Sequence, residues 1–468
     1  MDFSLNDEQK MLIETVRRFI AEECQPLEDE IEQTGTFDHA KAQALHHKAK
    51  ALGLYGMNMP EALGGGGLSN LDRILCEEQF GHTTDIIIRR AFGNVYEPLL
   101  HCKGEQIERW LKPAVEGTRT CAITITEPGA GSDAAGIKTT AVKNDKGWLL
   151  NGGKHFISDG EWSDFFLVSA KTGEKEISMF MVDKGLTGFT VGKDQKMMGL
   201  RGTPHLELFF DNVQLEDAAL LGEVGQGFKL AMGALNVVRL AQVGARAVGK
   251  ASHVCEIMVG WANERKQFNT KIGDFQMVQQ MIADSVIEIN AARWMVYHAA
   301  WMLDQGLDAR EQIAMVKVHA AETLGRVVDR AVQVFGGMGF CKELPIERYY
   351  RDARIYRIYD GTSEIHRGVI AKSAMKKGAA LFDVNRCGSD SLAFVPHRGP
   401  GEGCERTPHA AGVRRNRRPA PTQAGPQRRH RAQNTKPCNC FWKKSRQGSN
   451  TSATSASATS PSTARAAP

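Results

Sequence analysis

The chain has 468 residues, 42% of them hydrophobic, which is enough for two or three separate cores rather than one. Its formal net charge of +5 is unevenly placed, because residues from Ala379 onward hold 15 Lys and Arg against 4 Asp and Glu, leaving −6 on residues 1–378. The basic character therefore belongs to the tail, and it does not indicate that the body binds nucleic acid.

The cysteines and the first residues indicate the cellular compartment in which we expect the protein. Six of the ten cysteines are scattered through residues 1–378 without paired spacing, which is typical of a reduced intracellular protein. The first residues, MDFSLNDEQKM, contain neither an apolar signal segment nor an Arg-rich presequence. No apolar run reaches the length of a membrane span. We therefore expect a cytoplasmic protein with no membrane association.

Residues 1–120 have helical periodicity. Asn6 and Gln9 form a capping-box pattern ahead of apolar residues at helical spacing. Further helix-like segments cover 41–52, 71–80 and 106–114. The four glycines at 64–67 have no strand before them and no Gly-Lys-Ser/Thr after them, so they predict a turn between helices and not a phosphate loop.

The period changes near Cys121. Short runs rich in Phe, Val, Ile and Trp are separated by Gly, Asp and Lys turns, which predicts a small β-barrel or sandwich over 121–226; the runs are 148–150, 154–158, 164–170, 177–182 and 205–210. Long helical segments then predict a helical bundle over 227–378; they are 228–267, 275–305 and 309–335.

The tail, residues 379–468, contains few large apolar residues, so it cannot bury enough surface to offset its ordering entropy. We predict that it is disordered. Two origins fit its composition equally well, a functional basic arm and a frame-shifted or read-through end.

Two stretches of the predicted barrel are candidates for ligand contact. The first, ITITEPGAGSD at 123–133, ends a strand-like run in a Gly/Ser/Asp loop whose N–H groups and hydroxyls suit a polar planar ligand. It is not GxGxxG, so a Rossmann NAD site is disfavoured. The second, NGGKHFIS at 151–158, places Phe156 and Ser158 on one side of a strand. Either stretch alone also fits ordinary barrel packing.

A third stretch, 333–367, holds two glycine turns around a dense patch of Arg, Tyr and acidic residues. Asp360 comes directly before Gly361, Thr362 and Ser363, residues that typically begin a helix. Two interpretations of Asp360 fit these residues. It is either an N-cap or a carboxylate base directed into a site.

Taken together, residues 1–377 resemble the acyl-CoA dehydrogenase family. Both family signatures are present, at 125–136 and from Gln333 through Asp352. The resemblance implies that family's fold, with an N-terminal helical domain, a middle β-barrel and a C-terminal helical bundle. It also implies FAD as cofactor, an acyl-CoA substrate, a role in fatty-acid or acyl-CoA metabolism, an electron-transfer flavoprotein as electron acceptor and a homotetramer.

The resemblance implies roles for the barrel residues. Ile125, Thr126 and Ser132 match positions that contact the flavin ring and its pyrophosphate. Ser158 matches the residue whose hydroxyl reaches flavin N5, and Phe156 stands where many relatives have Trp against the ring.

Other cofactor positions are implied in the bundle. Thr362 and Glu364 match positions near the FAD pyrophosphate and adenosine. A further set matches positions that reach the FAD of a neighbouring subunit: Arg265, Phe268, Gln276, Gln333 and Gly337. An Arg fork suits phosphate oxygens, and Gly lets backbone approach a cofactor closely.

For catalysis, the resemblance favours Asp360 as the base that removes the α-proton, with Ser132, Arg239 and Gly361 as substrate contacts. Relatives with the base on the first bundle helix have Glu where this chain has Val238, so Asp360 is the one carboxylate candidate. Most relatives have Glu before Gly-Thr. Asp is one methylene shorter and reaches about 1.5 Å less.

Three features of the chain depart from the family pattern and leave alternative functions open. An Asp base also occurs in nitroalkane oxidase, which has the same fold and uses oxygen as acceptor, so a flavin oxidase is the alternative function. A non-catalytic flavoprotein with a nucleic-acid-binding tail is a second alternative function.

Two further positions depart from the family pattern. Asn269 replaces a family Gly, which Asn tolerates in a left-handed conformation. Arg89-Arg90 is unusual. We expect these two arginines to be a solvated surface pair, and the alternative is a contact to a CoA phosphate or to a polar acyl group.

Overall fold

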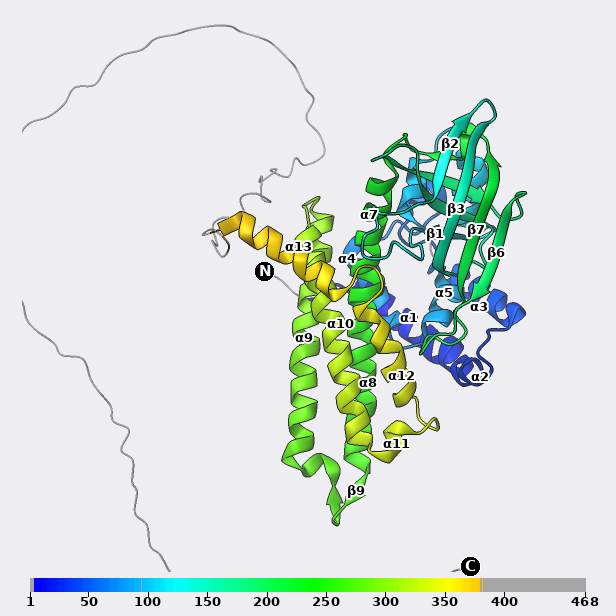
Figure 1. Cartoon of the computed structure of the whole chain (residues 1–468). Coiled ribbons are helices and arrows are strands. Elements are labelled where there is room, and N and C mark those ends of the chain that lie inside the picture. The colour runs from blue at the N-terminus through cyan, green and yellow to red at the C-terminus, as the bar shows by residue number, and fades with distance from the viewer. Residues whose placement is uncertain (1–3, 94, 379–380, 382–468) are drawn as a thin grey trace, which may run out of the picture. The chain divides into compact units, whose positions relative to one another are not determined.

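The computed structural model describes residues 4–93, 95–378 and 381. Helices come first, then a sheet, then a second set of helices (Figure 1), which confirms the predicted order α, β, α. The predicted disorder of residues 379–468 falls almost entirely outside the described residues. No described helix is long and apolar enough to cross a membrane.

The N-terminal helices begin where the sequence predicts. The capping box is formed, with Gln9 N donating to Asn6 Oδ1 at 2.8 Å and Asn6 N to Gln9 Oε1 at 3.1 Å. The glycines at 64–67 lie in a turn between helices, as expected. The main helices of this part are α1 (Asp7–Phe19), α2 (Glu28–Thr34), α3 (His39–Ala51), α4 (Asn70–Phe80), α5 (Asp85–Phe92) and α6 (Lys112–Glu116).

The middle part is an eight-stranded sheet in the order β6-β7-β3-β2-β4-β5-β8, with β1 paired in parallel with β4. The strands are β1 (Cys121–Thr124), β2 (Thr140–Asn144), β3 (Gly147–Ser158), β4 (Phe165–Lys171), β5 (Ile177–Asp183), β6 (Phe189–Asp194), β7 (His205–Leu215) and β8 (Leu220–Leu221). The two runs predicted at 148–150 and 154–158 are one strand, β3.

Strands β4 and β5 are buried on both faces. On one face Phe166 and Phe180 pack with Trp148 inside the β-domain. On the other face Phe165 and Met179 pack with Trp110 and its neighbours from the helical domain. Burial on both faces explains why these strands are nearly continuous apolar runs rather than alternating ones.

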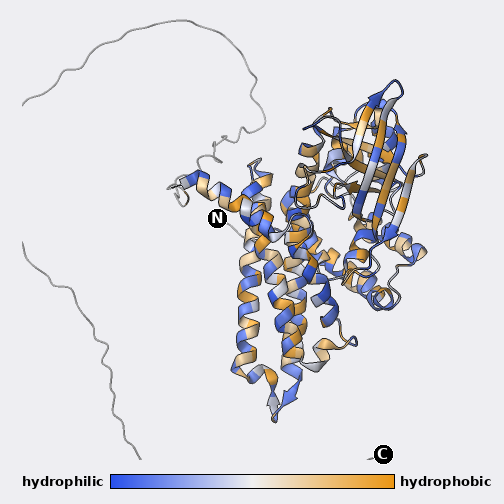
Figure 2. Ribbon diagram, viewed as in Figure 1, coloured by the Kyte–Doolittle hydropathy of each residue, from blue (hydrophilic) through white to orange (hydrophobic). Residues whose placement is uncertain are grey.

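The second helical part is built around α10 (Arg310–Phe335), which packs against α8, α9, α12 and α13. Its helices carry both hydrophobic and hydrophilic residues along their length (Figure 2), as amphipathic helices with one buried side do. The others are α7 (Gly227–Val238), α8 (Arg246–Glu264), α9 (Gln276–Asp304), α11 (Gly337–Phe340), α12 (Ile346–Ala353) and α13 (Ser363–Lys377), with a β9 (Lys266–Gln267)–β10 (Thr270–Lys271) hairpin after α8.

The helix predicted over 228–267 is interrupted. A π-helical segment, η7 (Arg239–Ala245), separates α7 from α8. Such segments insert an extra residue into a helix and are frequent at functional sites. Arg239 is the first residue of this segment.

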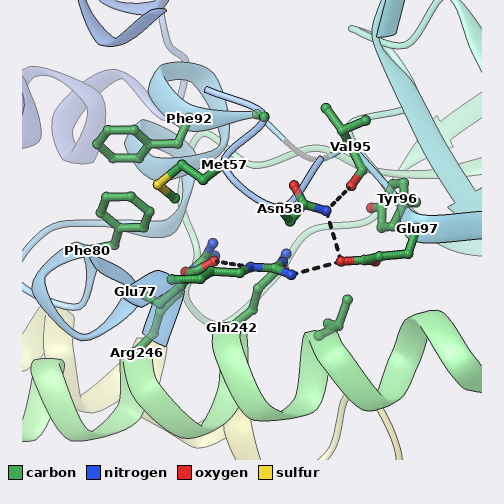
Figure 3. Close-up of a pocket in the computed structure, with 14 residues that line it drawn as sticks. Met57, Asn58, Glu77, Phe80, Phe92, Val95, Tyr96, Glu97, Gln242 and Arg246 are labelled. Carbon is green, nitrogen blue, oxygen red and sulfur yellow. Dashed lines mark hydrogen bonds and ion pairs between the residues drawn. The ribbon is translucent and has the colours of Figure 1, made fainter. Parts of the chain in front are cut away.

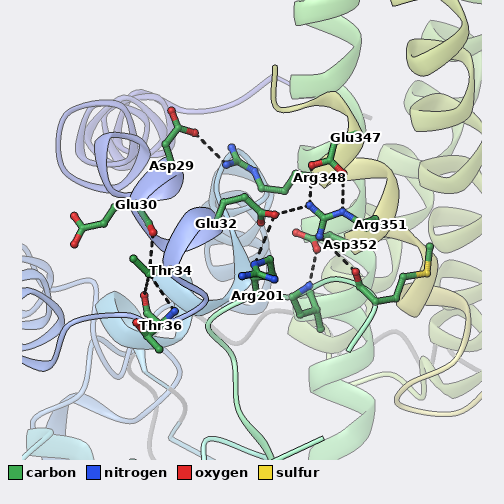
Figure 4. A network of polar contacts seen from close by, with 12 residues as sticks. Asp29, Glu30, Glu32, Thr34, Thr36, Arg201, Glu347, Arg348, Arg351 and Asp352 are labelled. Atoms are coloured by element: carbon green, nitrogen blue, oxygen red, sulfur yellow. Dashed lines mark hydrogen bonds and ion pairs between the residues drawn. The ribbon is translucent and has the colours of Figure 1, made fainter. Parts of the chain in front are cut away.

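A polar network joins the three parts (Figure 4). Arg351 of α12 contacts Glu32 of α2 at 2.7 Å, and Arg348 contacts Asp29 at 3.3 Å. Arg348 also contacts Glu28 at 2.6 Å. The turn after β6 joins the same network, because Leu200 N donates to Asp352 Oδ1 at 2.6 Å. This turn thus links the sheet to the bundle.

Candidate active site

Asp360 lies in a constrained turn just before α13. Its φ is +54°, and that of Gly361 is +93°. The N-cap of α13 is Thr362, whose Oγ1 accepts from Ile365 N at 3.3 Å. The interpretation of Asp360 as an N-cap is therefore wrong, because Thr362 is the N-cap and the helix begins at Ser363. A non-glycine residue held at positive φ costs free energy and is often found at functional sites.

The carbonyl oxygen of Asp360 is held by side chains from two helices. Arg239 Nε donates to it at 2.7 Å, and His366 Nε2 lies 3.2 Å from it. A Cβ added at Gly361 would come within 2.9 Å of His366 Nε2, in addition to the strain of its φ. The turn therefore has little freedom, and its shape fixes the direction of the Asp360 carboxyl.

The surroundings of the Asp360 carboxyl have opposing effects on its pKa. Burial raises the pKa, and the positive charges of Arg239, Arg89, Lys317 and Arg246 lower it. Burial has the larger effect, so the pKa lies above the ordinary aspartate value of 3.8. A carboxyl with a shifted pKa, surrounded by fixed cations, is a candidate for acid–base chemistry.

Arg89 and Arg90 are not a solvated surface pair, so that expectation is wrong. Both guanidinium groups face Asp159, at 2.8 Å and 2.9 Å, and the side chains of all three residues are at most 16% exposed. They are buried because α5 packs beneath the β-domain, where Arg90 also lies 4.1 Å from the ring centroid of Trp162.

A small polar cavity lies among α4, α5, η7 and α8, with a volume of about 30 Å³, which is room for about two water molecules (Figure 3). Its charged groups are paired: Arg246 with Glu77 at 2.6 Å, and Arg73 with Glu97 at 2.8 Å. Tyr96 also lines it. These pairs leave no pattern in the sequence, because their members lie far apart along the chain.

Comparison with known proteins identifies the architecture. Family models for the N-terminal, middle and C-terminal domains of acyl-CoA dehydrogenases match residues 6–118, 122–213 and 225–375. The chain belongs to the acyl-CoA dehydrogenase family. The resemblance inferred from the sequence is thereby confirmed, and the protein is an FAD-dependent oxidoreductase.

Three relatives illustrate the family. The chain is 38% identical to the acryloyl-CoA reductase (NADH) of Anaerotignum propionicum, covering 81% of this chain and 97% of that protein. It is 36% identical to the caffeyl-CoA reductase–Etf complex subunit CarC of Acetobacterium woodii, covering 80% and 99%. A solved acyl-CoA dehydrogenase from Bacillus anthracis complexed with FAD is 31% identical, covering 81% and 70%, with a TM-score of 0.75.

The residues of the β-domain suit an acyl-CoA dehydrogenase flavin site. The hydroxyls of Thr126, Ser132 and Ser158 make no hydrogen bond to another described residue, so they are available to a ligand. Phe156 is 48% exposed and stacks on His155, with ring centroids 3.9 Å apart. Its φ of +57° lies outside the extended region, so the strand alternation used to place it beside Ser158 does not apply there.

Glu127 and Lys154 support the loop that carries Thr126 and Ser132, and sequence reasoning missed both. The Glu127 carboxylate accepts from Lys138 N at 2.6 Å, Thr139 N at 3.0 Å and Lys154 Nζ at 2.9 Å. Lys154 is fully buried and also donates to Ile125 O at 3.1 Å. A lysine inside an apolar strand was the available signal, because buried lysines are paired almost without exception.

The remaining predicted cofactor residues of this acyl-CoA dehydrogenase divide into two groups. Thr362 and Glu364 adjoin the Asp360 turn. The others are exposed at the opposite end of the bundle, around the β9–β10 hairpin and α11 (Figure 1), with Phe268 90% exposed; they are Arg265, Phe268, Gln276, Gln333 and Gly337. One chain does not bring these five residues to Asp360.

Proposed function

We propose that the protein catalyses α,β-dehydrogenation of an acyl-CoA thioester, with Asp360 as the base that removes the α-proton. The observation that carries this proposal is the constrained, buried turn in which Arg239 holds the Asp360 backbone, while burial raises the pKa of the carboxyl. A general base needs such a fixed position and a tuned pKa.

The chain's own residues have separable tasks in this reaction. Arg239 and His366 fix the Asp360 turn from its carbonyl side, which leaves the backbone N–H of Asp360 to hold the thioester carbonyl. A donor at that oxygen stabilises the negative charge that develops as the α-proton leaves. Thr126, Ser132, Phe156 and Ser158 would hold FAD, which would supply the hydride acceptor when bound.

Electrons would leave the flavin through an electron-transfer flavoprotein. The support is the similarity to CarC, which is named as a subunit of a complex with Etf. A homotetramer would complete each flavin site, because the exposed group around Phe268 needs a second subunit to be useful.

The relatives named as reductases favour a second candidate, the reverse reaction. In that direction Asp360 acts as an acid and delivers its proton to the α-carbon. A raised pKa favours the protonated form that this step requires. The direction is then decided by the redox partner and not by the residues of the site.

Anaerobic bleaching of the FAD absorbance tests the proposal. Straight, branched and cyclic acyl-CoAs are added to the wild type, to Asp360→Ala and to Asp360→Asn. We expect bleaching by at least one thioester and a rate lowered by about 10²–10⁴-fold in both variants. Bleaching by a nitroalkane alone, followed by fast reoxidation in air, would show that the flavin oxidase is the correct alternative.

A further inference from the structure

Two histidines and a glutamate lie together where the turn between α4 and α5 meets α8. His82 belongs to that turn, and His253 and Glu256 lie three residues apart on α8, which places them on one face of the helix. Each residue offers one ligand atom, and these atoms all lie within 4.8 Å of one another. None of the three is among the residues proposed above for the flavin, the thioester or the base.

Two glycines allow the turn to approach α8 this closely. Gly81 directly precedes the histidine of the turn, and a Cβ added to it would lie 2.5 Å from Arg246 O. Gly249 lies about one helical turn before the histidine of α8, and a Cβ added there would overlap Glu78 O. The end of α4 therefore packs directly against the backbone of α8. Helix packing, and not a loose loop, brings the two histidines together.

The three side chains are not engaged elsewhere. Neither imidazole ring makes a hydrogen bond to another described residue, and Glu256 makes no ion pair with one. The ring centroids of His82 and His253 are 5.0 Å apart, and both side chains are partly buried. Polar groups removed from water are normally hydrogen-bonded. Ring nitrogens that approach each other without partners therefore suit a ligand that both rings share.

The surrounding charges narrow the class of that ligand. Four cations act electrostatically on the two rings: Arg17, Lys250, Arg293 and Arg348. Arg293 pairs with Glu78 at 2.8 Å, while Arg348 has its own partner in the network described above. Arg17 and Lys250 instead donate to a side-chain amide and to a backbone carbonyl, at 2.7 Å and 2.8 Å. Mg²⁺ and Ca²⁺ need several oxygen ligands, so these surroundings disfavour them. An ion that bonds strongly to imidazole nitrogen suits the cluster better.

We propose that His82, His253 and Glu256 bind a zinc ion that joins the α4–α5 turn to α8. Zinc takes imidazole nitrogen and carboxylate oxygen at about 2.0–2.2 Å, so its tetrahedral ligand atoms are about 3.3–3.5 Å apart. Glu256 is exposed and has no ion-pair partner among the described residues, so its carboxylate can turn toward the rings to complete the set. Three protein ligands leave the fourth position for water. This inference does not depend on the proposed function.

Zinc titration of the full-length chain with its FAD tests the inference. The protein carries no histidine tag and is first freed of metal with a chelator. Competition with a chromophoric chelator measures the stoichiometry and the dissociation constant, and thermal unfolding measures the stabilisation. We expect about one tightly bound zinc ion per chain and a higher thermal midpoint with zinc. Mg²⁺ and Ca²⁺ should leave the midpoint unchanged.

Three variants assign the ion to its ligands. His82→Gln, His253→Gln and Glu256→Gln each remove one ligand, so each should weaken zinc binding by more than the loss of an outer partner does, which is about 10- to 100-fold. His101→Gln and Glu264→Gln are matched controls at exposed positions outside the cluster, and they should bind zinc as the wild type does. The FAD absorbance and the midpoint without zinc show that a variant is folded. Glu256→Gln changes an exposed side chain, so it keeps the test valid if a histidine variant does not fold.

Three results would overturn the inference. The first is a wild type that binds no zinc at micromolar concentration. The second is equal zinc affinity in the wild type and the three ligand variants, because the ion would then be held by other groups, such as the thiolates of the ten cysteines. The third is a rise in the midpoint with Mg²⁺ as large as the rise with zinc, which would indicate a site built from oxygen ligands.

Discussion

Arg239 Nε lies 2.7 Å from the carbonyl oxygen of Asp360, so a residue of the π-helical segment η7 holds the turn that carries the proposed base. A second donor of the same guanidinium bonds Asn236 Oδ1 at 2.9 Å, which fixes the arginine one turn earlier on α7. The π-helical segment and the strained turn at Asp360 are thus connected through the side chain of Arg239.

We predict that Arg239→Ala lowers the rate of flavin reduction by about 10- to 100-fold, because it removes a charge-assisted hydrogen bond of about 1.5–3 kcal/mol and frees the turn. Asn236→Ala is the control, since it loosens Arg239 without removing it, and its effect should be smaller. Stopped-flow bleaching measures both. If Arg239→Ala reduces the flavin at a rate within twofold of wild type, the turn at Asp360 keeps its shape without the bond from Arg239.

The pH dependence of the reaction follows from the environment of Asp360. Dehydrogenation needs the ionised carboxyl, whose pKa burial raises above 3.8, so activity should fall as pH falls through that raised pKa. Lys317 is fully buried, its Nζ has no hydrogen-bond partner among the described residues, and its charge lowers the pKa of Asp360.

Replacing that lysine should therefore move the acid limb of the rate profile. Lys317→Met removes a cation that favours the carboxylate, so we expect the limb to shift to higher pH, with a slower rate at acidic pH and recovery at alkaline pH. Lys372→Met, which removes an exposed lysine of α13, is the matched control. A profile that only scales down without shifting would show that Lys317 acts through stability alone.

The sequence predicted the order of the helical and β parts because long periodic helices and short β-runs have distinct patterns. It missed α5 (Asp85–Phe92), a short helix with three consecutive isoleucines and two arginines. The structure shows why: α5 is buried nearly all round, and Arg90 is buried by virtue of Asp159, a partner 69 residues away. Pairing over such distances leaves no local pattern.

The sequence predicted single residues of the candidate site, but it did not predict the contacts that hold those residues in place. Asp360 was identified because it precedes a helix start inside a family motif. Its positive φ, the bond from Arg239 Nε and the charge of Lys317 depend on how η7 and α10 pack against the turn. Those contacts come from tertiary structure, which one sequence does not encode locally.

Glu127 should control flavin retention. Glu127→Ala removes the carboxylate that accepts from Lys138 N, Thr139 N and Lys154 Nζ, and it leaves the Lys154 ammonium buried without its counter-ion. We expect weaker FAD binding, measured as flavin released on ultrafiltration, together with a lower thermal midpoint. Ser132→Ala, which removes one hydroxyl from the same loop but no support, should release less flavin and leave the midpoint unchanged.

The paired charges of the cavity should contribute to stability in a non-additive way. Glu77 and Arg246 are each 5% exposed in their side chains and lie 2.6 Å apart, joining α4 to α8. Removing one partner leaves a buried charge without compensation, so Glu77→Gln and Arg246→Met should each cost about 3–5 kcal/mol. The double variant removes both charges and should cost less than the sum of the single variants. Thermal and urea unfolding at one protein concentration measure the cycle. If the losses in unfolding free energy of the two single variants are strictly additive in the double variant, Glu77 and Arg246 are not coupled. Glu77 would then be stabilised chiefly by Arg73, whose Nε lies 3.9 Å from its carboxylate.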